Sequence, residues 1–101
     1  MATKDKEVQK DSYGFIISFT TKANMSTTTS LKMRIRKGSS PVIEHGIDIS
    51  NIIDPPTGKV NYIVEEGDFD TVTTVKMQIV DDTPGRYLPS TPIKIRVKDN
   101  I

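Results

Sequence analysis

The side chains able to perform acid–base or covalent chemistry are few, and the only histidine is His45. A Ser-His-Asp arrangement would require His45 to lie in a site, but it stands between Glu44 and Gly46 at an expected strand end, without a triad signature. The chain has no cysteine, which excludes disulfides, thiolate metal sites and a cysteine nucleophile. We therefore expect a solvated or locally hydrogen-bonded histidine in a protein that is not an enzyme.

Carboxylates gather in one run, at Glu65, Glu66, Asp68 and Asp70. Their oxygens are the type that Ca²⁺ prefers, but the run lacks the spacing of a calcium-binding loop. No spacing in the chain places two carboxylates on opposite sides of a groove, as glycoside hydrolysis requires. We expect an acidic surface loop, with no metal and no cofactor.

Two basic stripes are more informative. In each stripe lysine or arginine alternates with apolar residues, so that the cations share the outward face of a strand. The six residues are Lys32, Arg34, Arg36, Lys94, Arg96 and Lys98. One interpretation is the ordinary solvated face of a half-buried strand, where lysine also discourages edge-to-edge aggregation. The other is a docking surface for a partner.

Nucleic acid is a weaker candidate for that partner. A formal charge of +1 provides no overall basic field, so the attraction would have to come from a local patch. Base stacking also needs exposed aromatic rings, whereas Tyr13, Phe15, Phe19 and Tyr62 all fall on apolar faces of expected strands. We expect these rings to lie in the core.

The elements that position these groups are predicted to be strands. Apolar and polar residues alternate over 12–20, 31–36, 42–45, 60–64, 75–80 and 93–98. Residues 31–36 and 42–45 are expected to form a hairpin, 22–30 a loop or ragged edge, and 47–53 either an irregular strand or one short helical turn. With no helix of about ten residues visible, the pattern predicts an all-β fold, an antiparallel β-sandwich with a small barrel as the competing closure.

One sharp turn anchors this arrangement. Asp54 is expected to close a side-chain turn, Pro55 and Pro56 fix φ, and Gly58 takes a positive φ. The strand that follows is expected to bury Val60, Tyr62 and Val64 on one face.

The chain is expected to form a single domain. At 101 residues it can bury roughly two-thirds of its unfolded surface. Residues 1–11 are expected to be a flexible lead-in and 12–101 the β-sandwich domain. No apolar run approaches the ~20 residues that cross a bilayer, and no signal peptide is visible. We expect synthesis in the cytoplasm and no membrane partner.

The order of several short segments resembles a known family. Residues 53–62 read Ile-Asp-Pro-Pro-Thr-Gly-Lys-Val-Asn-Tyr, residues 84–87 read Pro-Gly-Arg-Tyr, and residues 90–97 read Ser-Thr-Pro-Ile-Lys-Ile-Arg-Val. Together with the basic strands, this order resembles the amino-terminal domain of the upper baseplate protein of lactococcal-type siphophages. The resemblance spans nearly the whole chain after residue 12.

The resemblance implies an immunoglobulin-like sandwich of six to eight short strands. It also implies a structural component of a bacteriophage tail baseplate, located in the virion, which attaches the peripheral receptor-binding apparatus to the central tail hub. The partners would be the hub, or distal tail, protein and, through downstream segments, the receptor-binding protein. The chain would then be the amino-terminal part of a longer, homotrimeric polypeptide.

The isolated domain is expected to be monomeric, because alternation leaves no second apolar face and no heptad pattern is present. Two alternatives remain, a carbohydrate-binding β-sandwich and, less favoured, a nucleic-acid-binding β-domain. Exposure of Tyr62 or Tyr87 would favour the carbohydrate-binding module, because sugars stack on exposed rings.

Overall fold

The computed structural model describes residues 6–99, which form short strands and two single-turn 3-10 helices. The elements are β1 (Lys6–Gln9), β2 (Ile16–Thr20), β3 (Leu31–Lys37), β4 (Ile43–Ile47), η1 (Ile49–Asn51), β5 (Ile52–Asp54), η2 (Pro55–Thr57), β6 (Lys59–Ile63), β7 (Thr74–Asp81), β8 (Leu88–Pro89) and β9 (Ile93–Lys98). Each segment in which apolar and polar residues were predicted to alternate therefore contains a strand. The segment 47–53, left open by its sequence, contains both a helical turn and a strand.

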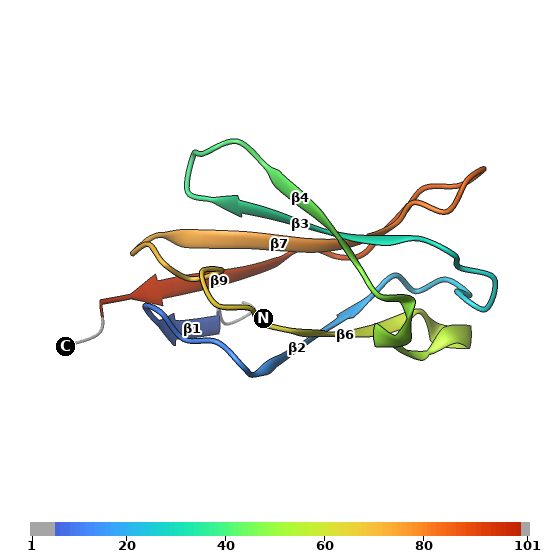
Figure 1. Cartoon of the computed structure of the whole chain (residues 1–101), viewed down its shortest axis with the longest axis horizontal. Coiled ribbons are helices and arrows are strands. Elements are labelled where there is room, and N and C mark those ends of the chain that lie inside the picture. Colours follow the sequence, from blue (N-terminus) through green and yellow to red (C-terminus); the bar gives the residue numbers. More distant parts are fainter. Residues whose placement is uncertain (1–5, 100–101) are drawn as a thin grey trace, which may run out of the picture.

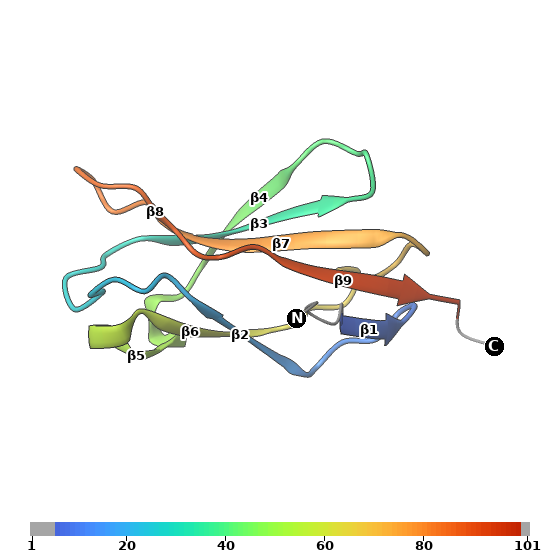
Figure 2. The same cartoon turned by 180° about the vertical axis from the view of Figure 1, so that it is seen from behind.

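The strands form two layers (Figure 1). The larger sheet has the order β1-β9-β7-β3-β4, with β8 paired to β7, and the smaller sheet has the order β2-β6-β5. The chain passes from β4 in the larger sheet to β5 in the smaller one, and the view from behind shows the same two layers (Figure 2). The all-β sandwich is confirmed. Its larger sheet is mixed instead of purely antiparallel, because β1 pairs with β9 in parallel.

The core lies between the inward faces of the two sheets. In the larger sheet Met33 is opposite Ile79 and Ile35 is opposite Met77, and all of these side chains are buried. Burial of one such side chain contributes about 1.5–3 kcal/mol. The buried residues of the smaller sheet are Ile17, Phe19, Val60 and Tyr62.

The lead-in predicted for residues 1–11 is wrong for its second half, because Lys6–Gln9 is β1. Val8 lies opposite Val97 and packs against the core, and Lys10 N donates to Lys98 O at 2.8 Å. One apolar residue among charges is a weak strand signal, and the pairing joins segments almost a chain length apart. Residues 1–5 lie outside the described part of the chain.

The strand predicted over residues 12–20 begins later, at Ile16. Gly14 has a φ of 87°, which breaks the alternation that precedes the strand. Tyr13 is consequently 58% exposed, and its predicted core position is wrong. Phe15 is half-buried and stacks on the buried Phe69 at a centroid distance of 6.0 Å.

The turn before β6 has the predicted glycine conformation but a different closure. Gly58 has a φ of 74°. Asp54 makes no side-chain cap, so the predicted side-chain turn is wrong. Its backbone oxygen instead accepts from Gly58 N at 3.0 Å and from Thr57 Oγ1 at 3.2 Å. Pro55 and Pro56 occupy the first positions of η2, where a missing N–H costs no helical hydrogen bond.

Candidate functional site

The two basic stripes lie on one surface, the outward face of the larger sheet. They are separated by β7, whose Lys76 is opposite Arg36 of β3 and opposite Lys94 of β9. All three side chains are exposed. We call Arg36, Lys76 and Lys94 the basic row. Adjacent strands lie about 4.8 Å apart, so three cations follow one another across three strands.

Lys76 is the residue that sequence reasoning missed as a candidate. Its alternation with Val75 and Met77 indicated an outward position. The amino-acid sequence does not indicate, however, that β7 lies between β3 and β9. It also does not indicate that Lys76 is in register with Arg36 and Lys94. The three cations become neighbours only through the pairing register of strands that are far apart in the sequence.

The other predicted basic residues differ in how they are neutralised. Arg34 Nε lies 2.9 Å from Glu44 Oε2, and Lys32 Nζ lies 3.4 Å from Glu44 Oε1. At the opposite edge Lys98 Nζ lies 2.6 Å from Glu7 Oε2. The hydrogen bond from Lys98 lowers the pKa of Glu7, aided by the charges of Lys98 and Arg96.

None of the ion pairs or side-chain hydrogen bonds found within residues 6–99 includes a member of the basic row. The same holds for Arg96, although Glu7 is opposite it in the β1–β9 pairing. The ion pairs on this face involve Lys32, Arg34 and Lys98. Among the described residues, the basic row and Arg96 are therefore the cations of this face that have no ion pair or side-chain hydrogen bond.

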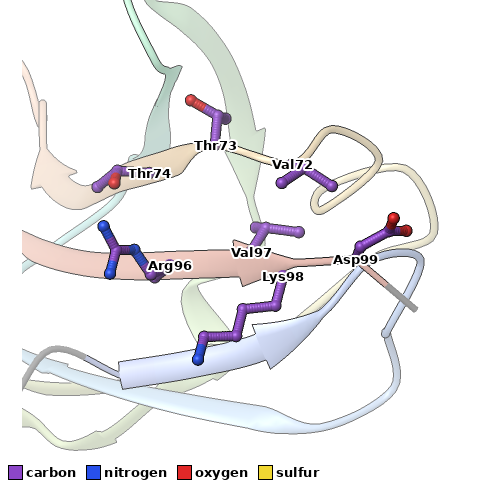
Figure 3. A pocket seen from close by; sticks show the side chains of 7 residues that line it. All are labelled: Val72, Thr73, Thr74, Arg96, Val97, Lys98 and Asp99. Carbon is purple, nitrogen blue, oxygen red and sulfur yellow. The ribbon is translucent and has the colours of Figure 1, made fainter. Parts of the chain in front are cut away.

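Two open hollows are lined by cations of this face, and one of them includes members of the basic row. One, of about 120 Å³, is lined by Arg34, Arg36, Val42, Lys76 and Gln78. The other, of about 700 Å³, lies where β7 begins and β9 ends, and includes Arg96 and Lys98 (Figure 3). In Figure 3 the Arg96 side chain extends from β9 on the side of Thr74, the Lys98 side chain extends across β1, and Asp99 lies just beyond the end of β9. Both hollows are open surfaces with polar and apolar lining.

Two tyrosines named in the carbohydrate hypothesis behave differently. Tyr87 is 55% exposed, accepts a long hydrogen bond from Arg34 Nη1 at 3.5 Å, and has Lys32 Nζ 5.9 Å from its ring centroid. Tyr62 is buried and donates to Asp68 Oδ2 at 2.6 Å. Burial and this hydrogen bond raise the pKa of Tyr62. Tyr87 alone of the two offers a ring to a ligand.

The acidic run has structural contacts. Asp68 is buried and accepts from Tyr62, while Lys37 Nζ donates to Gly67 O at 2.7 Å and to Asp70 Oδ1 at 2.8 Å. The hydrogen bonds from Lys37 and Thr71 lower the pKa of Asp70. Within residues 6–99, no three side chains of the metal-binding types gather into a site.

His45 agrees only in part with the expected solvated or locally hydrogen-bonded state, because it is half-buried. Its Nε2 atom is covered and makes no hydrogen bond, and its ring packs near that of Tyr62 at a centroid distance of 6.3 Å. The half-buried ring is therefore neither solvated at Nε2 nor hydrogen-bonded there. It contributes packing under the β4 edge.

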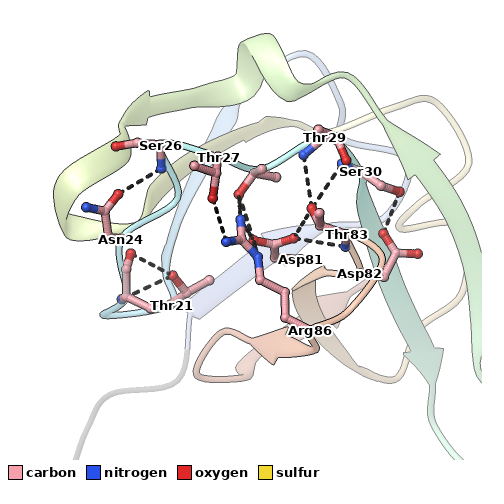
Figure 4. Close-up of polar contacts among 12 residues, drawn as sticks. Thr21, Asn24, Ser26, Thr27, Thr29, Ser30, Asp81, Asp82, Thr83 and Arg86 are labelled. Carbon is pink, nitrogen blue, oxygen red and sulfur yellow. Dashed lines mark hydrogen bonds and ion pairs between the residues drawn. The ribbon is translucent and has the colours of Figure 1, made fainter.

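The densest polar cluster is at one end of the sandwich (Figure 4). Asp81 is fully buried at the end of β7, and its Oδ2 lies 2.8 Å from Arg86 Nη2 and accepts from Thr28 Oγ1 at 2.6 Å. Its Oδ1 accepts from Thr83 N at 3.1 Å and from Thr83 Oγ1 at 2.6 Å. Burial acts to raise the pKa of Asp81, but hydrogen bonds from Thr28, Thr83 and Arg86 together outweigh it and lower that pKa.

This cluster joins loop 22–30 to the turn after β7. Arg86 also donates to Thr27 Oγ1 and Thr28 Oγ1, each at 2.7 Å. The loop's other side is held by the Gly58 turn, through Met25 N to Pro55 O at 2.7 Å. Asp81 and Arg86 are therefore paired with each other and hydrogen-bonded to threonines of the loop and the turn.

Comparisons with protein-family models, with curated proteins and with solved structures each found no match. No helix among residues 6–99 is long and apolar enough to cross a membrane.

Proposed function

We propose that this chain is a structural domain of a bacteriophage tail baseplate. It attaches the peripheral receptor-binding apparatus to the central hub through protein–protein contacts. The baseplate assignment rests on the resemblance of segments 53–62, 84–87 and 90–97 to the upper baseplate protein family. The observation that carries the docking role is that both basic stripes share one face of the larger sheet.

The proposed mechanism is recognition by shape and charge. The inward side chains of the larger sheet are buried in the core. Its strands therefore hold the outward side chains at the regular spacings of a β-sheet. Charge complementarity at such a surface steers association and selects the partner more than it adds affinity. Receptor binding and trimerisation belong, in this proposal, to segments of a longer parent polypeptide.

Size-exclusion chromatography of the chain mixed with candidate hub proteins tests the proposal. We expect co-elution with a hub protein, and weakened co-elution when Arg34 and Arg96 are both changed to Glu. A matched control is Lys59→Glu, an exposed charge reversal on β6 in the other sheet. Absence of a complex with any hub candidate would overturn the proposed function.

The isolated domain is proposed to be monomeric, although the smaller sheet exposes three isoleucines, one of which is Ile53 of β5. Ile16 and Ile63 are opposite each other and each is 58% exposed. Ser18 and Asn61, the next outward pair, hydrogen-bond to each other at 2.7 Å, so a polar pair follows Ile16 and Ile63 along β2 and β6. Light scattering across a dilution range tests this, and a stable trimer would overturn it.

A carbohydrate-binding role is the second candidate, favoured by the exposed Tyr87. The other exposed tyrosine, Tyr13, precedes β2 of the smaller sheet, whereas Tyr87 contacts Arg34 of the larger sheet. The two rings therefore form no joint platform. A glycan-array screen with Tyr87→Ala as control tests this role, and binding lost in the variant would support it.

A further inference from the structure

We infer that the partner surface presents an extended acidic segment whose carboxylates bind across Arg36, Lys76 and Lys94. This inference deepens the proposed function and rests on it. It names the chemistry of the partner and narrows the contact to the basic row, with Lys76 at its centre.

The first step is the unbalanced charge of the row. Like charges directly opposite on neighbouring strands destabilise a sheet. Elsewhere on the same face this fold supplies a carboxylate, Glu44 beside Lys32 and Arg34, and Glu7 beside Lys98. Among the described side chains none does so for the row. An incoming carboxylate would relieve repulsion that the folded domain retains.

The second step is the hollow at one end of the row. Its volume of about 120 Å³ suits one carboxylate side chain, and Arg34, Arg36 and Lys76 line it. Arg34 is already paired with Glu44, and Gln78 Nε2 already donates to Ser90 O at 2.8 Å. Arg36 and Lys76 are the two cations of this hollow that have no partner among the described side chains. An arginine can hold a carboxylate through two parallel hydrogen bonds.

The third step is spacing. The row crosses three strands and so spans about 10 Å between its outer backbones. Carboxylates at alternate positions of an extended segment share one face and recur every ~6.8 Å. Long arginine and lysine side chains accommodate the remaining difference. Two or three acidic residues at alternate positions therefore match the row.

Protein carboxylates fit this surface better than nucleic acid does. Binding to single strands combines a basic groove with aromatic rings on which bases stack. The row itself carries no aromatic residue. The exposed Tyr87 lies instead beside Lys32 and Arg34, with Lys32 near its ring. The row offers cations without a stacking platform.

The test uses a labelled nine-residue peptide with Glu at positions 3, 5 and 7 among threonines, titrated into the 101-residue chain. Amide chemical shifts in ¹⁵N-labelled protein report the site, and their concentration dependence reports affinity. We expect the largest shifts around residues 36, 76 and 94. Lys76→Gln should weaken binding about three- to fivefold, the effect of losing one exposed ion pair.

Two controls separate this from general charge attraction. Lys59→Gln removes the same charge from the smaller sheet and should leave the affinity unchanged, and a peptide with Gln at positions 3, 5 and 7 should not bind. Equal losses from Lys59→Gln and Lys76→Gln would overturn the inference. Tighter binding of a nine-nucleotide single strand than of the acidic peptide would also overturn it, in favour of nucleic acid.

The proposed function can fail separately. If Lys76→Gln leaves binding to an identified hub protein unchanged, the inference is wrong and the docking function stands. If no hub protein binds the chain while the acidic peptide does so at the row, the baseplate function is wrong. The acidic-segment preference then describes another partner.

Discussion

Charge is handled differently in two regions of this domain. At the closed end, made of loop 22–30, the Gly58 turn and the turn over residues 81–86, Asp81 and Arg86 are bonded to each other and to threonines. On the outward face of the larger sheet, the basic row has no such partners among the described side chains. The contrast indicates which charges stabilise the fold and which remain available to another molecule.

The largest expected effect comes from breaking the closed end. Asp81→Ala leaves Arg86, Thr28 and Thr83 without their common acceptor, and removing one partner of a buried ion pair typically costs about 3–5 kcal/mol. Urea unfolding followed by circular dichroism measures the loss. Asp99→Ala, an exposed carboxylate after β9, is the matched control and should change little. A loss no greater than that of the control would show that the cluster is not stabilising.

Gly58→Ala tests the other side of the closed end. Gly58 is in the left-handed region, and an added Cβ would meet Thr21 Oγ1 and lie 2.5 Å from Ala23 O. Backbone strain alone costs about 1–2 kcal/mol there, and the contact with fixed backbone adds to it. Thermal unfolding measures the effect. Gly85→Ala has a similar positive φ of 92° with open space around it, so it should cost less. Equal losses would mean that strain, and not contact with the loop, sets the cost.

Sequence patterns predicted the regular part of this molecule. Alternation identified β3, β6, β7 and β9, and placed Met33, Tyr62 and Ile95 in the core, because a half-buried strand imposes a period of two. It failed where Gly14 breaks the period and where β1 depends on a distant partner. The positive φ of Gly58 was predictable because residue type limits backbone conformation.

The site was only half predictable. The outward cations of β3 and of β9 could each be predicted from alternation. That Lys76 lies between them in one row depends on strand order and register. The Asp81–Arg86 cluster was also missed, because its members come from a loop and a turn that no periodicity connects. The run Asp81-Asp82-Thr83-Pro84-Gly85 signalled a turn and nothing about its contacts.

Lowering the pH should reduce the free energy of unfolding through Asp81 at the closed end, and should leave the cations of the basic row charged. The pKa of Asp81 is lowered in the folded protein, so folding is favoured by its ionised form. That stability is present above the unfolded pKa of about 3.9 and is lost as pH falls through the lower folded pKa. Unfolding free energies between pH 7 and pH 2 measure this. Asp81→Asn should show a shallower decline in acid, and an identical slope would assign the acid sensitivity to other carboxylates.

The smallest effect on stability is expected at the centre of the row. Lys76→Gln removes a cation that lies between two others, so the repulsion lost should offset the packing lost by its methylenes. The free energy of unfolding should change by less than about 0.5 kcal/mol, in the stabilising direction if repulsion dominates. Raising salt screens exposed charges and should reduce the difference between the variant and the unmodified protein. A destabilisation above 1 kcal/mol at low salt would mean that Lys76 has a partner within the fold. The row would then resemble the closed end, and its cations would no longer be available to an acidic partner.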